Sequence, residues 1–330
     1  MAAIHIGISG WRYTPWRGDF YPEGLTQKRE LQFASRAVNS IEINGSFYAL
    51  QTPKRYAEWY ADTPEGFLFS VKAPRFITHI LRLRDVHKPM ANFFASGVLE
   101  LKEKLGPILW QFPPSFKFDA TLFETFLAEL PTDTQQAAAL ARQHEPRLNG
   151  KASMKAYAKK PLRHAVEIRN KTFAVPEFIQ LLDKHGVALV VADTAGKWPY
   201  VEDVTANFMY LRLHGDKQLY ASGYSAEALQ RWGDRIERWA QGKQPADAHL
   251  IDPHHTPRRR KQRDVFCFFD NDSKFAPPSM HANCCNVSGW TNTCSPNLAG
   301  CRNQEYCHDA SRANPHPADH RHHPFHGADG

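Results

Sequence analysis

The chain has 330 residues, 42% of them hydrophobic and 12% aromatic, which suits one large globular domain or two medium ones. No apolar run approaches the roughly 18 residues of a membrane span, and the start MAAIHIGISGW lacks the segments of a secretory signal. We therefore expect a cytoplasmic protein without a membrane partner. The net charge of +7 permits a polyanionic partner but is also an ordinary solubility feature.

Short β-rich runs alternate with helix-like segments along most of the chain, as expected of a parallel sheet with crossover helices. Eight such runs occur. They are HIGISGW (5–11), SIEIN (40–44), FLFSVK (67–72), GPILWQF (106–112), HAVEIR (164–169), ALVVAD (188–193), FMYLRLHG (208–215) and DVFCFFDND (264–272).

Three intervening segments show helical periodicity most clearly. DATLFETFLAEL (119–130) and VPEFIQLLDKHG (175–186) each place apolar residues on one face. SAEALQRWGDRIERWAQG (225–242) adds an N-cap, Ser225, and a closing glycine, Gly242. Only 194–207 is irregular. Eight strands and about seven helices in ~270 residues predict a TIM-type (β/α)8 barrel.

Every predicted strand has at least one polar residue at its end. In IEIN (41–44) the isoleucines share one face and Glu42 and Asn44 the other, because strand side chains alternate. In a barrel the carboxyl ends of the strands surround a common pocket. These ends supply Ser9, Glu42, Asn44, Lys72, Gln111, Glu167, Arg169, Asp193, Arg212, His214, Asp270, Asn271 and Asp272.

This mixture of carboxylates and cations suits acid/base chemistry on an anionic substrate, with hydrolase or lyase chemistry as candidates. The catalytic candidates are Glu42, Lys72, Glu167, Asp193 and His214. Aromatic residues after the strands provide walls or stacking faces. The substrate-binding candidates are Ser9, Trp11, Tyr13, Asn44, Tyr48, His79, Gln111, Arg169, Arg212, Tyr220, Tyr224 and Asn271.

Two other interpretations of the polar strand ends stay open. They could form a structural network of glutamate with arginine, in which case Glu42→Gln would stabilise the fold without changing any activity. Lys72 could be a Schiff-base nucleophile if it were desolvated, although its acidic neighbours are expected to hold it charged.

Phosphate and metal binding are weaker expectations. HGDKQLYASGYS (214–225) follows the seventh strand, where barrel loops often hold phosphate. The strand ends offer His214, His79 and a few acids, so a single divalent metal would fit better than a trinuclear centre. No other cofactor is indicated.

Two basic runs, 151–164 and 257–263, raise the question of a nucleic-acid partner. Both directly precede predicted strands, so we expect them on the barrel face opposite the pocket. A solvated charged loop is the simpler interpretation.

Nine motifs resemble those of the YecE-like proteins, also called domain of unknown function 72. They are IGISGWRYTPWRGDFYPEGL, IEINGSFY, FSVKAPRFITH, WQFPPSF, VEIRN, VVADT, YLRLHG, YASGYS and FFDND, in order from residue 6 to residue 272. The resemblance implies a TIM-type barrel and a family without an established reaction. It is more remotely similar in architecture to endonuclease IV and xylose isomerase, which hold metal ions at the same end.

The chain changes character near residue 274. Beyond it the sequence has no helical stripe, although a barrel needs an eighth helix there. We therefore expect a barrel domain over 1–274 with its eighth helix lost, followed by a disordered, frameshifted tail over 275–330. Five of the six cysteines lie in this tail, at spacings that match no zinc module.

The leading functional expectation is an enzyme acting on a small anionic or phosphorylated substrate at the carboxyl end of the strands. The alternative is a nucleic-acid binding or repair protein that takes an extruded nucleotide into the pocket. The sequence does not identify the substrate, the reaction or the oligomeric state.

Overall fold

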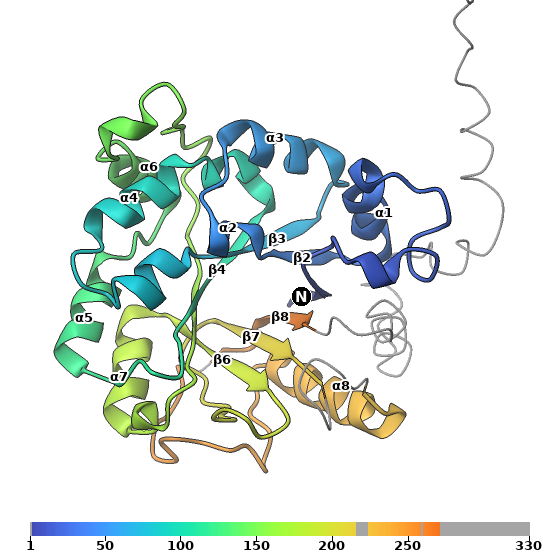
Figure 1. The fold of residues 1–330 in the computed structure, drawn as a ribbon. Coiled ribbons are helices and arrows are strands. Elements are labelled where there is room, and N and C mark those ends of the chain that lie inside the picture. Colours follow the sequence, from blue (N-terminus) through green and yellow to red (C-terminus); the bar gives the residue numbers. More distant parts are fainter. Residues whose placement is uncertain (1, 216–223, 259, 271–330) are drawn as a thin grey trace, which may run out of the picture. The chain divides into compact units, whose positions relative to one another are not determined.

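Eight parallel strands close into a barrel, in the order of the sequence and with β8 paired to β1 (Figure 1). This computed structural model describes residues 2–215, 224–258 and 260–270. It confirms the predicted TIM-type barrel and all eight predicted strands. The strands are β1 Ile4–Ser9, β2 Ser40–Ile43, β3 Leu68–Lys72, β4 Leu105–Gln111, β5 His164–Glu167, β6 Ala188–Asp193, β7 Phe208–Leu213 and β8 Asp264–Phe269.

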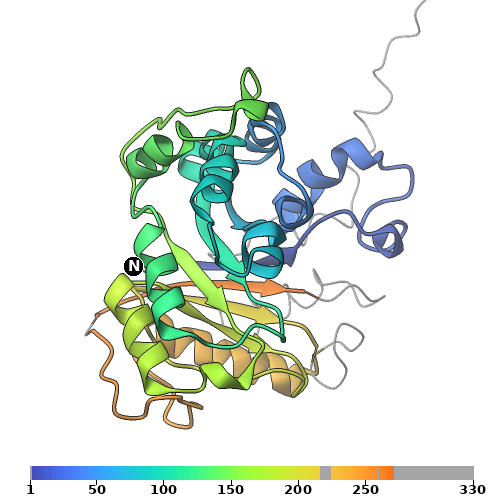
Figure 2. The same cartoon turned by 60° about the vertical axis from the view of Figure 1, so that its left-hand side comes forward.

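Helices surround the strand ring on its outside (Figures 1 and 2). The α-helices are α1 Glu30–Ala37, α2 Gly45–Tyr48, α3 Pro53–Asp62, α4 His87–Ala95, α5 Ala120–Glu129, α6 Thr134–Ala141, α7 Pro176–His185 and α8 Ala226–Ala240. Shorter 3-10 turns span Thr14–Trp16, Gln27–Arg29, Val98–Lys104, Pro146–Leu148 and Lys171–Phe173, and a π-turn spans Phe76–Ile80.

The three helices with the clearest sequence signals form as predicted. In α5 the side chain of Asp119 caps the helix by accepting from the backbone N–H of Leu122. In α8 the predicted cap Ser225 accepts from Ala228, and Gly242 has the positive φ of a terminating glycine. Residues 194–207 are irregular, again as predicted.

Alternation along each strand separates two apolar layers. Ile41 and Ile43 of β2 pack outward with the helices, whereas Glu42 points into the barrel. β2 is paired on both sides, so its polar face is not that of an edge strand. The interior below the polar residues is filled by Leu109, Ala165, Ala188, Val190, Ala192, Phe208, Tyr210, Phe266 and Phe268.

The predicted loss of the helix after β8 falls outside the described residues, which end at 270. The same is true of Tyr220, Asn271, Asp272 and the tail after residue 274 with its five cysteines. Most of the predicted phosphate loop, 216–223, lies outside the described residues too. Cys267, the remaining cysteine, is buried in β8.

Candidate functional site

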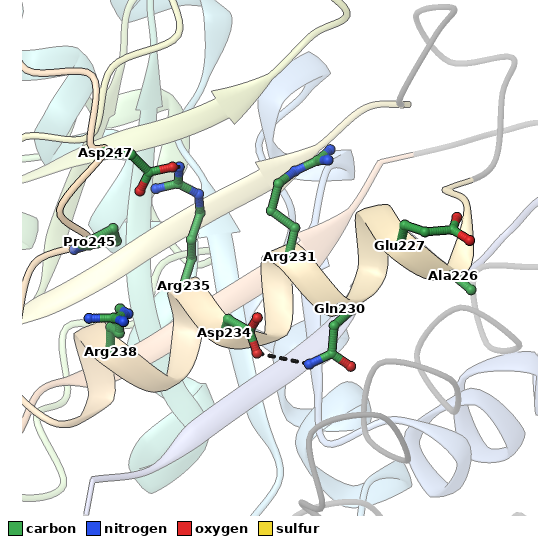
Figure 3. Close-up of a pocket in the computed structure, with 9 residues that line it drawn as sticks. All are labelled: Ala226, Glu227, Gln230, Arg231, Asp234, Arg235, Arg238, Pro245 and Asp247. Atoms are coloured by element: carbon green, nitrogen blue, oxygen red, sulfur yellow. Dashed lines mark hydrogen bonds and ion pairs between the residues drawn. The ribbon is translucent and has the colours of Figure 1, made fainter.

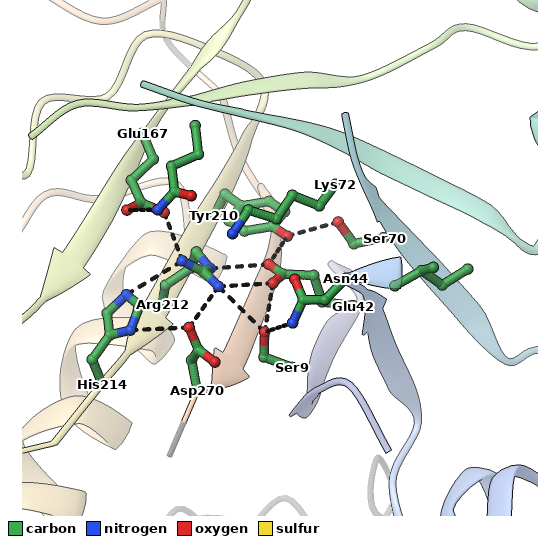
Figure 4. A network of polar contacts seen from close by, with 12 residues as sticks. Ser9, Glu42, Asn44, Ser70, Lys72, Glu167, Tyr210, Arg212, His214 and Asp270 are labelled. Carbon is green, nitrogen blue, oxygen red and sulfur yellow. Dashed lines mark hydrogen bonds and ion pairs between the residues drawn. The ribbon is translucent and has the colours of Figure 1, made fainter. Parts of the chain in front are cut away.

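Inward-facing polar side chains gather at the carboxyl ends of the strands (Figure 4). We call this group the polar mouth. It comprises Ser9, Glu42, Asn44, Lys72, Gln111, Glu167, Arg169, Arg212, His214 and Asp270. Seven strands therefore bring together most of the predicted site residues, and the two-residue steps 42/44, 167/169 and 212/214 face the same way as expected.

Arg212 of β7 is the centre of the polar mouth. Its side chain is 1% exposed and forms ion pairs with three carboxylates. Nε and Nη2 donate to Glu42 at 3.1 and 2.9 Å, Nη1 donates to Glu167 at 2.7 Å, and Nη2 donates to Asp270 at 2.7 Å. One buried cation thus balances carboxylates from β2, from β5 and from the end of β8.

Each glutamate receives further hydrogen bonds. Ser9 Oγ and Tyr210 OH donate to Glu42 at 2.5 and 2.6 Å. Gln111 Nε2 and Arg169 Nε donate to Glu167 at 2.8 and 2.7 Å. In each of these contacts the glutamate oxygen is the acceptor.

The charges fix the protonation state of this network. Burial alone would raise the pKa of Glu167, but Arg169 and Arg212 outweigh it and hold the pKa well below its usual range. Burial opposes ionisation of Asp270 too, and Arg212 and His214 lower its pKa overall. Burial lowers the pKa of Arg212, yet Glu42, Asp270 and Glu167 raise it well above its usual value. Glu167 and Asp270 are therefore poorly suited to proton transfer near neutral pH.

Lys72 of β3 differs from its neighbours. Its side chain is buried, its ammonium lies 4.3 Å from the centre of the Phe47 ring, and no described residue accepts a hydrogen bond from it (Figure 4). Desolvation and then the charge of Arg212 lower its pKa to about 8, against the opposing charges of Glu42 and the other acids. The expectation that its acidic neighbours hold it charged stays a prediction: the acids raise its pKa, Arg212 opposes them, and an amine with a pKa of about 8 is still mostly protonated at pH 7.

His79 lies beside Lys72 on the π-turn after β3. Its ring meets the Phe47 ring edge-on at 5.1 Å between centroids, and its Nδ1 bonds to the Thr78 hydroxyl at 2.8 Å. Burial and then the charges of Lys72 and Arg169 lower its pKa to about 4. His79 is therefore a neutral imidazole near pH 7.

His214 and Arg169 complete the polar mouth. His214 is fully buried, with Nδ1 3.1 Å from Asp270 Oδ2 and Nε2 3.4 Å from Arg212 Nη1. The guanidinium of Arg169 lies 3.7 Å from the centre of the Trp198 ring, so its position is fixed from both sides by Glu167 and Trp198.

Asp193 does not join the other carboxylates. Its neighbour Ala192 faces the barrel interior, which turns Asp193 outward toward α8. Tyr224 OH donates to its carboxylate at 3.0 Å and accepts from the backbone N–H of Gly215. Asp193 and Tyr224, both predicted as site residues, thus belong to the layer between the strands and the helices.

The aromatic candidates divide between core and surface. Trp11 is buried against Trp59 in the outer core, and Tyr13 donates its hydroxyl hydrogen to the carbonyl of Ser9. Tyr48, in contrast, is 71% exposed.

Asp270 of the polar mouth, and Tyr210 and Ser70 next to it, carried no predicted role. Tyr210 and Ser70, whose hydroxyls lie 2.6 Å apart, sit two positions before Arg212 and Lys72, and this spacing could have revealed them. Asp270 was noted only as a strand end.

Metal binding and basic surfaces were also predicted. Within residues 2–215, 224–258 and 260–270, no group of three or more His, Cys, Asp or Glu side chains is arranged to hold a metal ion.

The placement of the first basic run was wrong at its start, because Lys151 shares a cavity with Phe47 and Tyr48, which follow β2 at the mouth end. None of the helices described is both long and apolar enough to cross a membrane.

A cavity of about 650 Å³ lies along the outer side of α8 (Figure 3). Three acids and three arginines line it, so it favours neither sign of charge. Arg235 there pairs with Asp247 at 2.6 Å and with Glu202 at 2.9 Å, which makes it part of the scaffold.

Comparison with solved structures shows the same fold. A DUF72 family protein from Enterococcus faecalis V583 matches with a TM-score of 0.62 and 16% identity, over 87% of this chain and 95% of that one. A DUF72 family protein from Thermotoga maritima MSB8 matches with a TM-score of 0.60 and 22% identity, over 88% and 99%.

Sequence relatives cover less of the chain. UPF0759 protein YunF of Bacillus subtilis is 33% identical over 121 residues, which is 34% of this chain and 41% of that protein. UPF0759 protein YecE of Escherichia coli K12 is 28% identical over 113 residues, 34% of this chain and 39% of its own length. The chain thus aligns with about two fifths of each relative. The model of the family described as protein of unknown function DUF72 matches residues 5–293, so the chain belongs to this family, as the motifs predicted.

Proposed function

We propose that the chain is an enzyme that binds a small anionic substrate at the polar mouth and uses Lys72 as its reactive group. One observation carries the proposal: Lys72 is a buried amine with a pKa of about 8, in contact with the Phe47 ring and with no hydrogen-bond acceptor among the described residues. A group with this pKa gives and takes a proton near neutral pH.

The same observation supports an anionic substrate. A desolvated cation without a partner is costly, and an anion placed against it removes that cost. Arg169 adds a second cation whose orientation is fixed by Glu167 and Trp198. A phosphate or carboxylate would therefore be held between Lys72 and Arg169.

The carboxylates then act as positioning residues. Glu42, Glu167 and Asp270 neutralise Arg212 and leave Lys72 without an acidic partner of its own. This arrangement moves the acid/base role from the carboxylates, which the sequence favoured, to the amine. In the Schiff-base interpretation the neutral amine attacks a carbonyl carbon, and the carbonyl oxygen leaves as water with the two amine protons as the imine forms.

Competitive acetylation tests the proposal. Trace acetic anhydride at a series of pH values, with peptide mass spectrometry, gives the pKa of each lysine from its relative reactivity. We expect Lys72 to titrate near 8, and the exposed Lys155 serves as the internal reference. Phosphate monoesters or small carboxylates should protect Lys72 but not Lys155. A Lys72 that titrates like Lys155, or that no anion protects, would overturn the proposal.

The nucleic-acid alternative has less support. The basic runs are partly paired, since Lys159 lies 3.7 Å from Asp133 and Arg258 3.8 Å from Asp183. Binding of DNA or RNA with a steep salt dependence would favour this alternative over a small-molecule enzyme.

A further inference from the structure

A second cavity, of about 480 Å³, lies beside the polar mouth and has no part in the proposed chemistry. Four segments bound it: the turn after β2, the turn after β3, helix α4, and the residues around the 3-10 turn Pro146–Leu148. We call it the side groove. Its volume is in the range of small-molecule sites, about 300 to 1,000 Å³.

Aromatic rings form one part of the side groove. Tyr48 is 71% and Phe76 49% exposed, and both line it. Leu50, Ile77 and Leu148 add apolar surface. Large apolar side chains left in contact with water at a concave site are typical of ligand binding. Exposed aromatic faces in particular suit a flat ring.

Two cations form the other part of the side groove. Arg147 and Lys151 line it, and none of the described residues that line it is acidic. Lys151 has no ion pair or side-chain hydrogen bond with any residue in the part of the chain that the structure describes. Arg147 shares its charge with Glu145, so Lys151 is the cation that favours an anionic group at this end.

The basic segment is held in place by α4. Asn92 Nδ2 donates to Glu145 Oε2 at 2.7 Å, and the backbone N–H of Glu145 donates back to Asn92 Oδ1 at 2.9 Å. Glu145 in turn accepts from Arg147 Nε at 2.6 Å. Ser153 continues the attachment, because its N–H donates to the carbonyl of Ala95 at 2.8 Å. The cations are thus part of a built wall.

We propose that the side groove binds a mononucleotide, with the base against Tyr48 and Phe76 and the phosphate at Lys151 and Arg147. A mononucleotide carries both a flat ring and an anion, and the groove offers a surface for each. Phe47 belongs to both sites, since its ring contacts Lys72 and also lines the groove. The inference goes beyond the proposed function, because binding here requires no reaction at Lys72.

Isothermal titration of the whole chain with AMP, adenosine and ribose 5-phosphate tests the inference. AMP should bind at least about tenfold more tightly than either fragment, because each fragment lacks one of the two contacts. Tyr48→Ala and Lys151→Ala should each weaken AMP binding about fivefold or more. Tyr157→Ala and Lys155→Ala are matched controls, exposed and outside the groove, and should change nothing.

Several outcomes would overturn the inference: no binding of AMP, equal binding of the fragments, or loss of affinity in the control variants. Binding of a single-stranded oligonucleotide without binding of AMP would assign the groove to nucleic acid instead. The acetylation profile of Lys72 separates the two proposals. If Lys72 titrates near 8 while AMP does not bind, only the side groove inference fails.

Discussion

Arg212 and Glu42 form a two-point ion pair across the barrel interior. Nε lies 3.1 Å from Oε2, and Nη2 lies 2.9 Å from Oε1, while Tyr210 and Ser9 donate to the same two oxygens. Neither side chain of the pair is more than 1% exposed. In this low-dielectric setting the pair is stable only while both partners keep their charge and geometry.

We expect Glu42→Gln to destabilise the fold by about 3 kcal/mol. The new amide would direct N–H groups at donors, and Arg212 would lose part of its compensation. This is the opposite of the stabilisation that a simple structural network suggested from the sequence. Urea unfolding measures the effect. Glu103→Gln is the control, because Glu103 is exposed and, among the residues that the structure describes, accepts a side-chain hydrogen bond from the Tyr60 hydroxyl alone, so its replacement should cost about 1 kcal/mol or less.

Arg212→Met should destabilise the protein most near neutral pH. Without the guanidinium, Glu42, Glu167 and Asp270 face one another, so their pKa values rise and the folded variant takes up protons more readily than its unfolded chain. Its stability therefore increases as the pH falls, whereas that of the parent protein decreases. The unfolding free energies of the variant and of the parent protein, measured from neutral to acidic pH, should therefore converge as the pH falls. Parallel curves would contradict the central role of Arg212.

The sequence predicted the barrel well because alternation in most strands was visible. Glu42 between isoleucines, and the pairs Glu167/Arg169 and Arg212/His214, each mark an inward face, and closure of the barrel brings these faces together. Where polar and apolar residues alternate at a strand end, the polar residues could thus be assigned to the inward face from the sequence alone.

Two features could not be read in this way. Strand β6 is apolar on both faces, so nothing in VVAD showed that Ala192 points inward and Asp193 outward. The state of Lys72 depends on which cation pairs with which acid. Only the three-dimensional contacts show that Arg212 engages all the nearby carboxylates and leaves Lys72 desolvated.

Gly7→Ala should unfold the barrel or cost more than about 4 kcal/mol. A Cβ at Gly7 would lie 1.8 Å from the carbonyl oxygen of Ser40, its partner in β2, and neither backbone can move without breaking the β1–β2 pairing. At Gly45 the nearest atom would be Gln51 Nε2 at 3.5 Å, so Gly45→Ala is the control and should be tolerated. Thermal unfolding followed by circular dichroism distinguishes the two variants.

Buried histidines should make the fold sensitive to acid. Burial lowers the pKa of His164 from 6.5 to about 4, and its ring is held between Trp110 Nε1 at 3.1 Å and the Pro131 carbonyl at 2.8 Å. The unfolded chain binds this proton first, so stability present above pH 6.5 is lost as the pH falls toward 4. The loss from His164 is about 3 kcal/mol. His164→Gln should flatten the curve of unfolding free energy against pH in this window, and an unchanged slope would contradict the assignment.

Lys72→Met should stabilise the fold at pH 7 by about 2 kcal/mol, because it removes a desolvated charge and loses only the contact with Phe47. Since the pKa falls from 10.5 to about 8, the cost is fully present below pH 8 and is relieved as the pH rises to 10.5, so the gain should shrink over that range. Lys104→Met is the matched control. Lys104 is equally buried, but its ammonium donates to the carbonyls of Tyr60 and Thr63 at 2.7 Å, so its loss should destabilise. Urea unfolding of the two variants and the parent protein at pH 7 and at pH 10.5 gives the comparison. Destabilisation by both substitutions would show that Lys72 is a structural lysine like Lys104, and stabilisation by Lys72→Met alone would mark a group kept in the barrel at a cost to stability.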